Sequence, residues 1–252
     1  MRSQAQYRVS FAIDVAGSVA FGALDVVTVL ALFRVRPTLA GFTFAEVFLM
    51  TALASTAFAL ADLAVGNVER LRFYVRTGLF DAVLVRPLGA LMQLLAMDVG
   101  ARRVGRVAIG MALLGTAAAH ADLVLTPARL ALLVVAPVAG ALIFSALFVA
   151  TATVTFWWVE SGELGNALTY GGHDFSGYPI TVYGALFRRL FAYGLGFAFV
   201  AYYPALALLG RHDPLGVPAA LGYGCPLIAA VAAFLAGLLW RAGVRHYRST
   251  GS

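Results

Sequence analysis

The chain has 252 residues, of which 62% are hydrophobic and only 12% are charged, and its formal net charge is +6. A soluble domain carries about 25% charged residues and has too little interior to hide so much apolar surface. The composition therefore excludes an ordinary soluble protein and indicates an integral membrane protein.

The basic residues and the single cysteine limit the chemistry further. All 18 basic residues are arginine, so the chain lacks the lysine of a P-loop nucleotide site and of Schiff-base catalysis. Cys225 is the one cysteine, which excludes an internal disulfide and a cluster of thiolate metal ligands. The arginines are scattered between apolar segments, which favours an orientation signal in a membrane over a nucleic-acid-binding surface.

Six apolar segments are predicted to cross the membrane as helices. A helix needs about 20 residues to span the hydrocarbon core, where every backbone polar group must be hydrogen-bonded internally. In chain order, the predicted spans are residues 9–32, 42–65, 104–119, 130–158, 186–203 and 221–240. The first is too long for the apolar region of a signal peptide, so we expect it to remain in the membrane. The predicted fold is one domain, residues 1–252, an all-α integral membrane protein with six transmembrane helices.

Acidic residues in the first two spans are candidate functional groups. Asp14 and Asp25 are eleven residues apart, so they lie about 20° apart around the first helix. Acids inside membranes mark polar pathways or contacts with arginine, although structural contacts between helices would also explain this pair. Glu46 and Asp62 lie near opposite ends of the second span, where we expect them at the membrane interfaces.

The arginines predict the orientation of the chain, because short cytoplasmic loops carry an excess of them. With the N-terminus in the cytoplasm, the inner side holds 14 arginines, including Arg188 and Arg189 before the fifth span. The outer side holds four: Arg34, Arg36, Arg129 and Arg211. Six spans then place both termini in the cytoplasm.

Residues 66–103, between the second and third spans, form a long charged segment that is predicted to be cytoplasmic. Val68, Leu71 and Val75 fall on one helical face. Gly78 is suited to end that helix, because glycine tolerates the left-handed conformation of a helix cap.

A second short apolar face follows, formed by Leu79, Phe80, Val83 and Leu84. Pro87 is expected to stop this helix and to begin the next one at its first position. We therefore predict two or three short amphipathic helices at the cytoplasmic membrane surface. A hairpin that turns at Thr77 and Gly78 is the alternative.

Residues 202–226 form an irregular segment on the outer side, before the sixth span. It contains four prolines and several glycines, and its apolar part, residues 205–209, is too short to span a membrane. These features fit a shallow re-entrant element that protein rather than lipid surrounds.

Other polar and aromatic patterns favour structural roles. The four histidines are dispersed without metal-ligand spacing, which predicts surface or interfacial positions. The run GGHDFSG contains Ser176, His173 and Asp174, but adjacent His and Asp side chains do not line up as a catalytic triad. The pairs Trp157–Trp158 and Tyr202–Tyr203 are typical of aromatic belts at the membrane interfaces.

Two motifs resemble the ABC-2 family of transporter permeases, in its six-helix branch. The run YVRTGLFDAVLVRPL resembles the family pattern I/V-R-T-G-x-x-D-x-x-L-x-R-P-L, with matches at Arg76, Thr77, Gly78, Asp81, Leu84, Arg86, Pro87 and Leu88. The runs SGYPITVYGALFRRL and GFAFVAYYPALALLG resemble the Tyr-Pro motif and the fifth helix of that branch, at Tyr178, Pro179, Tyr203 and Pro204. The resemblance covers nearly the whole chain, and the acidic pair Asp14 and Asp25 departs from the family pattern.

The resemblance implies the membrane subunit of an ATP-binding-cassette transporter, usually an exporter, in a bacterial-type inner or plasma membrane. Such permeases pair with a second permease subunit, identical or homologous, and with two cytosolic ATPase subunits. ATP and magnesium are expected on those partners, so the chain itself is not expected to be an enzyme or to hold a cofactor. This agrees with the missing P-loop lysine.

The charged cytoplasmic segment is then the candidate contact with the ATPase. A short amphipathic helix, anchored by Leu and Phe in the membrane face, would transmit displacement to the spans that it joins. The residues assigned to this coupling are Arg72, Arg76, Gly78, Asp81, Arg86 and Pro87. The alternative is that the segment merely lies on anionic lipid.

Two rival functions come from other classes. A stand-alone secondary transporter would use Asp14 and Asp25 to carry protons. An intramembrane enzyme would act on lipid.

Overall fold

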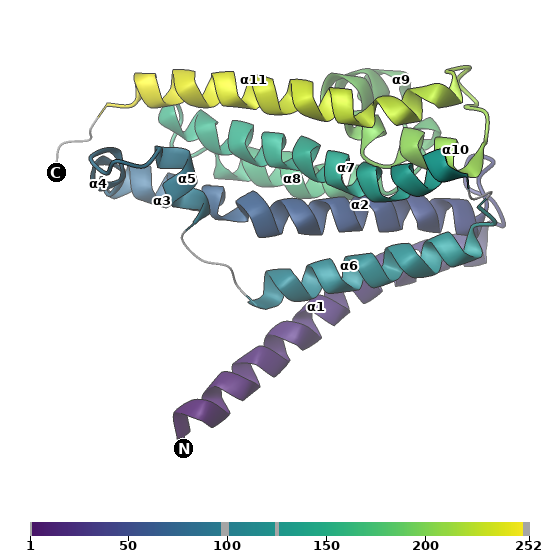
Figure 1. The fold of residues 1–252 in the computed structure, drawn as a ribbon, viewed down its shortest axis with the longest axis horizontal. Coiled ribbons are helices and arrows are strands. Elements are labelled where there is room, and N and C mark those ends of the chain that lie inside the picture. Colours follow the sequence, from purple (N-terminus) through teal and green to yellow (C-terminus); the bar gives the residue numbers. More distant parts are fainter. Residues whose placement is uncertain (1, 97–100, 124–125, 249–252) are drawn as a thin grey trace.

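The structure is a computed structural model that describes residues 2–96, 101–123 and 126–248. Within these residues every regular element is a helix, apart from one isolated β-bridge between Leu39 and Phe42. Figure 1 shows the long helices after the first one side by side in an elongated bundle, with short helices towards its two ends. The first helix crosses this bundle obliquely, so that its N-terminal half points away from it. The all-helical fold expected from the sequence is confirmed for the described part of the chain.

Five long helices build the bundle: α1 (Arg2–Val35), α2 (Phe44–Val65), α6 (Ala101–His120), α7 (Pro127–Thr153) and α11 (Cys225–His246). They correspond to the first four predicted spans and the sixth. Among the described residues, three helical runs are long and apolar enough to cross a membrane, namely Phe44–Arg76, Pro127–Phe156 and Ala220–His246. A bent pair of helices adds a fourth if it is counted as one span. The six-span count and the orientation stay predictions.

The core of the bundle lies around α2, which packs against α1, α6 and α7 (Figure 1). Of its most apolar stretch, 78% is buried inside the protein, against 22% for α11, whose outer face is therefore free for lipid. Small residues allow close approach: Gly140 of α7 packs on Ala57, and Gly110 of α6 packs on the backbone of Thr56. Such contacts hold membrane helices together where lipid removes the hydrophobic drive for association.

The predicted fifth span, residues 186–203, is not one straight helix. The chain is helical over Ala185–Gly194 and again over Phe197–Leu209, but the two parts are bent by 66° at the break between them. Gly196 makes the corner with a φ of +78°, a left-handed conformation that glycine adopts readily. Hydropathy detected the apolar run and missed the break.

The helices α8 and α10, which come after α7 in the chain, both pack against α7. Gly165 of α8 (Gly162–Ser176) packs near Thr151, close to the end of α7. Beyond α8, Phe197 lies 5.8 Å from Phe144 between ring centroids, and Val200 contacts Gly140. The elements η5 (Phe197–Phe199) and α10 (Tyr202–Leu209) therefore continue the path that α8 begins.

The irregular segment before α11 forms a hairpin at the end of the bundle. After α10, the element η6 (Ala219–Gly224) folds back so that Gly222 packs on the carbonyl of Tyr203. Arg211 ties the same region to the start of α2, where it pairs with Glu46 and donates to the Gly41 carbonyl at 2.6 Å. The depth of this hairpin in a membrane stays a prediction.

The short helices α3 (Leu71–Arg76), α4 (Phe80–Leu84) and α5 (Ala90–Leu95) mark one end of the bundle, which we call the inner end. Figure 1 shows the start of α1 and the end of α11 on this side. It also shows α9 (Ala185–Phe187), which η4 (Arg188–Gly194) continues, towards the opposite, outer end. Arg188 and Arg189 therefore do not belong with the inner arginines, and the inner count falls from 14 to 12 of 18.

Candidate functional site

The charged segment at the inner end folds into short helices, as the sequence predicts. We call residues 66–95 the elbow; it comprises η1 (Gly66–Arg70) followed by α3, α4 and α5. Gly78 separates α3 from α4 with a φ of +71°. The hydroxyl of Thr77 donates to the carbonyl of Phe73 at 2.8 Å and helps to close the end of α3.

One side of the elbow is buried against the helix bundle. Val68, Leu71 and Val75 are buried, which confirms that they share one face. Phe80 is fully buried, with ring centroids 5.2 Å from Phe156 and 5.0 Å from Tyr247. The elbow is thus anchored on protein at the ends of α7 and α11, and the expected anchoring in the membrane face is wrong for these side chains.

The other side of the elbow is exposed and partly apolar. Leu79 and Leu84, expected on the same apolar face as Phe80 and Val83, are exposed, because five residues of α4 offer only a narrow buried stripe. Further exposed apolar side chains are Phe73, Val85, Leu88 and Met92. We call this exposed side, with the arginines between these residues, the elbow outer face.

The predicted coupling residues occupy three different environments in the elbow. Arg72 pairs with Glu160, and Arg76 lies 3.7 Å from the same carboxylate, so both connect the elbow to the segment that begins α8. Asp81 lies in the first turn of α4, close to Tyr247; burial, and then this carboxylate, raise the pKa of the Tyr247 hydroxyl.

Arg86 and Pro87 are exposed on the connection between α4 and α5. The prediction that Pro87 begins a helix is wrong, because α5 starts at Ala90 after Gly89, whose ψ of 133° is extended. Residues 85–89 therefore form an exposed bend that carries Arg86, rather than a continuous helix.

A buried ionic cluster fixes the elbow where it leaves α2. Asp62 is 3.2 Å from Nε of Arg103 and 2.9 Å from Nη1 of Arg106, and its side chain is 4% exposed. Arg103 also donates to the side-chain oxygen of Asn67 at 2.7 Å. Glu46 and Asp62 thus lie at opposite ends of α2, as expected, and each is paired with arginine.

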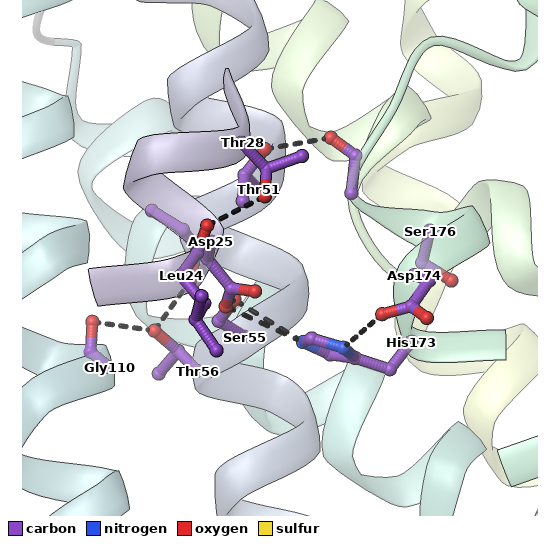
Figure 2. A network of polar contacts seen from close by, with 12 residues as sticks. Leu24, Asp25, Thr28, Thr51, Ser55, Thr56, Gly110, His173, Asp174 and Ser176 are labelled. Atoms are coloured by element: carbon purple, nitrogen blue, oxygen red, sulfur yellow. Dashed lines mark hydrogen bonds and ion pairs between the residues drawn. The ribbon is translucent and has the colours of Figure 1, made fainter. Parts of the chain in front are cut away.

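A second polar cluster lies halfway along the bundle, between α1, α2 and α8 (Figure 2). Ser55 donates to Oδ2 of Asp25 at 2.7 Å, and its hydroxyl is 3.3 Å from Nε2 of His173. Nδ1 of His173 is in turn 3.3 Å from Oδ1 of Asp174. Because Ser55 donates its proton to Asp25, this chain of contacts differs from a Ser-His-Asp triad, in which serine donates to histidine.

The polar cluster opens into a cleft of about 320 Å³. The cleft is lined by hydroxyl, carboxylate and imidazole groups together with one glycine: Asp25, Thr28, Thr51, Ser55, His173, Asp174, Gly177 and Tyr178. Thr51 donates to the carbonyl of Gly177 at 3.0 Å and so fixes the end of α8 beside α2. The first Tyr-Pro motif therefore begins at the rim of the cleft, and Pro179 leads into η3 (Ile180–Val182).

Sequence reasoning identified Asp25 but missed the histidine beside it. His173 is 6% exposed, so the expected surface position is wrong. The signal was hidden because α8 contains four glycines among polar residues and has no apolar run. Ser176, from the rejected triad, donates to the carbonyl of Gly172 at 2.7 Å instead. Asp14 lies in α1, but its side chain is outside the described residues, and so is its predicted alignment with Asp25.

The tyrosine of the second Tyr-Pro motif, Tyr203, is buried inside the protein and hydrogen-bonded there. Tyr203 donates to the Tyr193 hydroxyl at 3.2 Å, while its neighbour Tyr202 donates to Asp213 at 2.7 Å. Both tyrosines are buried in protein, so they do not form the expected aromatic belt. Pro204 lies buried in the first turn of α10, where a missing N–H costs little.

Within the described residues, the long apolar helices are those of a membrane protein, and short charged helices lie at one end of the bundle. The sequence model of the family described as "ABC-2 family transporter protein" matches residues 19–251. The chain belongs to this ABC-2 family. It is an ABC-2 type permease, a multi-pass membrane protein of the ABC transporters. Comparison with curated proteins and with solved structures gave no match.

Proposed function

We propose that this permease is the membrane subunit of an ATP-driven exporter in a bacterial-type inner membrane. It works with a second permease subunit, identical or homologous, and with two cytosolic ATPase subunits that bind ATP and magnesium. The observation that carries the proposal is the elbow outer face, where exposed apolar side chains alternate with Arg72, Arg76 and Arg86 at one end of the bundle. Apolar anchors among charged groups are what a protein-binding surface offers a partner.

The contacts of the elbow supply a route by which a push from the ATPase reaches the membrane part. Phe80 is wedged against Phe156, beyond the end of α7, and against Tyr247 at the end of α11. Arg72 is paired with Glu160, two residues before α8. Since α8 carries His173 and Asp174 at its other end, movement of the elbow would shift one wall of the polar cleft. We assign the cleft to the cargo pathway on this ground.

The interaction with the ATPase is tested by co-purification. Arg76→Glu reverses a charge on the elbow outer face, and we expect it to weaken co-purification of the ATPase at least tenfold. Arg34→Glu makes the same change on an exposed arginine at the last turn of α1 and should have no effect. Equal recovery of ATPase with both variants would contradict the proposed interface.

The alternative, a proton-coupled secondary transporter, is favoured by one observation, the contact of Asp25 with Ser55 and His173 in the cleft. The two functions differ in their energy source. Proteoliposomes that hold the permease without ATPase, under an imposed proton gradient, should show no gradient-dependent export. Export that persists there and disappears in Asp25→Asn would replace the ATP-driven proposal with the proton-coupled one.

A further inference from the structure

A groove at the inner end separates the elbow from the last turns of α11. Its volume is about 370 Å³. The elbow contributes one wall, formed by Val83, Leu84, Leu88, Gly89 and Ala90, and α11 contributes the other, formed by Trp240, Arg241, Val244 and Arg245. The groove lies far from the Asp25 cleft and shares no lining residue with it.

The lining combines apolar walls with two positive charges. Arg241 and Arg245 are one helical turn apart and both exposed. Among the described residues that line the groove, none is acidic. A ligand that fits this chemistry has an anionic head and an apolar body.

The position of the groove along α11 tells where such a ligand would come from. Leu235, Leu238 and Leu239 are exposed on the apolar part of the helix, which is mostly unburied, and Arg241 follows two residues after Leu239. An acyl chain that packs on these leucines carries its phosphate to the level of the two arginines. Arginines at a helix C-terminus also stabilise the helix dipole, but that role does not require an apolar groove beside them.

We propose that the groove binds an anionic phospholipid. The phosphate lies against Arg241 and Arg245, the glycerol and the first methylenes lie beside Leu84, Leu88 and Val244, and the rest of an acyl chain runs along the exposed leucines of α11. Basic pockets on the cytoplasmic side of membrane proteins are known to recognise acidic lipid headgroups by this combination. The lipid then forms part of the support of the elbow, a role that does not depend on which partner the elbow contacts.

The tryptophans of the chain make the proposal directly measurable. The chain has three, and Trp240 lies in the groove while Trp157 and Trp158 are exposed near the end of α7. In the variant W157F/W158F, Trp240 is the one remaining tryptophan. Bromine on an acyl chain quenches tryptophan fluorescence on contact. Vesicles of phosphatidylcholine that contain a minor fraction of brominated phosphatidylglycerol therefore report the lipid beside Trp240.

We expect the quenching of Trp240 to correspond to at least a twofold enrichment of phosphatidylglycerol over its bulk mole fraction. Brominated phosphatidylcholine at the same mole fraction should show no enrichment, so its quenching should match the bulk value. Inorganic phosphate in the buffer should not relieve the quenching by brominated phosphatidylglycerol. Removing both charges, R241Q/R245Q, should return the quenching to the bulk value. Removing two outer arginines instead, R34Q/R36Q, should leave the enrichment unchanged.

Three outcomes would overturn the proposal. The first is quenching at the bulk mole fraction in W157F/W158F itself, which would mean that protein or another lipid fills the groove. The second is equal enrichment of both lipids. The third is enrichment that survives R241Q/R245Q, or that inorganic phosphate abolishes, which would assign the arginines to a soluble anion. Unlabelled phosphatidylglycerol added to the W157F/W158F vesicles should relieve the quenching, so the result does not rest on the charge variants alone.

Discussion

Asp62 holds two arginines of a neighbouring helix at the point where α2 gives way to the elbow. Its carboxylate contacts Arg103 through one oxygen and Arg106 through the other, and all three side chains are at most one-fifth exposed. Burying such charges costs free energy that their mutual attraction offsets only while all partners are present. The cluster is therefore a site where one substitution leaves uncompensated charge behind.

We predict that Asp62→Ala destabilises the protein by about 3 kcal/mol, because Arg103 and Arg106 lose their buried partner. Thermal unfolding of the purified protein in detergent measures the effect as a fall in Tm. Glu160→Gln removes the acid of an exposed ion pair and should cost less than about 1 kcal/mol. Equal Tm values for Asp62→Ala and the unmodified protein would show that solvent reaches the cluster and screens it.

At the scale of elements, the elbow is held to the bundle by side chains that its short helices bury. Its short helices are too brief to be stable by themselves, so packing must hold them. Phe80 supplies that packing, since it is fully buried between Phe156 and Tyr247, whereas its neighbour Leu79 is exposed. Adjacent residues of similar hydrophobicity therefore have opposite roles.

We predict that Phe80→Ala costs about 3 kcal/mol, as expected when a large buried ring is removed from a core. The variant should lose stability locally as well as globally. Amide hydrogen exchange should speed up more in α3 and α4 than in α2, relative to the unmodified protein. Leu79→Ala should change neither Tm nor exchange appreciably. If the two variants exchange alike, Phe80 is not the anchor of the elbow.

At the scale of the whole molecule, the ion pair of Arg72 with Glu160 connects the elbow to α8 and hence to the cleft. Both side chains are partly exposed, so the pair contributes little to stability. Its proposed role is to carry displacement. If the pair matters for coupling and not for stability, its acidic and basic residues can be swapped without loss of function.

We predict that Arg72→Glu lowers ATP-dependent transport by the assembled transporter at least fivefold without lowering Tm by more than a few degrees. The exchanged pair, Arg72→Glu with Glu160→Arg, should recover most of the transport. Transport and Tm are measured on the same preparations. Failure of the exchanged pair to recover transport, with the ATPase still bound, would mean that Arg72 acts on the partner and not through Glu160.

The sequence by itself determined that this is a membrane protein, which segments form its long apolar helices, and that the elbow is amphipathic. These follow from composition and from periodic patterns within one segment, which tertiary contacts do not alter. The buried face of Val68, Leu71 and Val75 and the left-handed Gly78 belong to this group. Motif resemblance added the family, because the matching residues lie in the chain order that the family pattern has.

The tertiary structure alone decided the break within the predicted fifth span, the anchor of the elbow and the polar cleft. The break at Gly196 and the alignment of α8 with α10 depend on packing against α7, which hydropathy does not register. Phe80 and Leu79 are equally apolar in sequence, and contacts with residues 76 and 167 positions away separate them. Asp25, Ser55 and His173 meet across gaps of 30 and 118 residues. Proximity of that kind is a property of the folded chain, since no local pattern encodes which distant residues become neighbours.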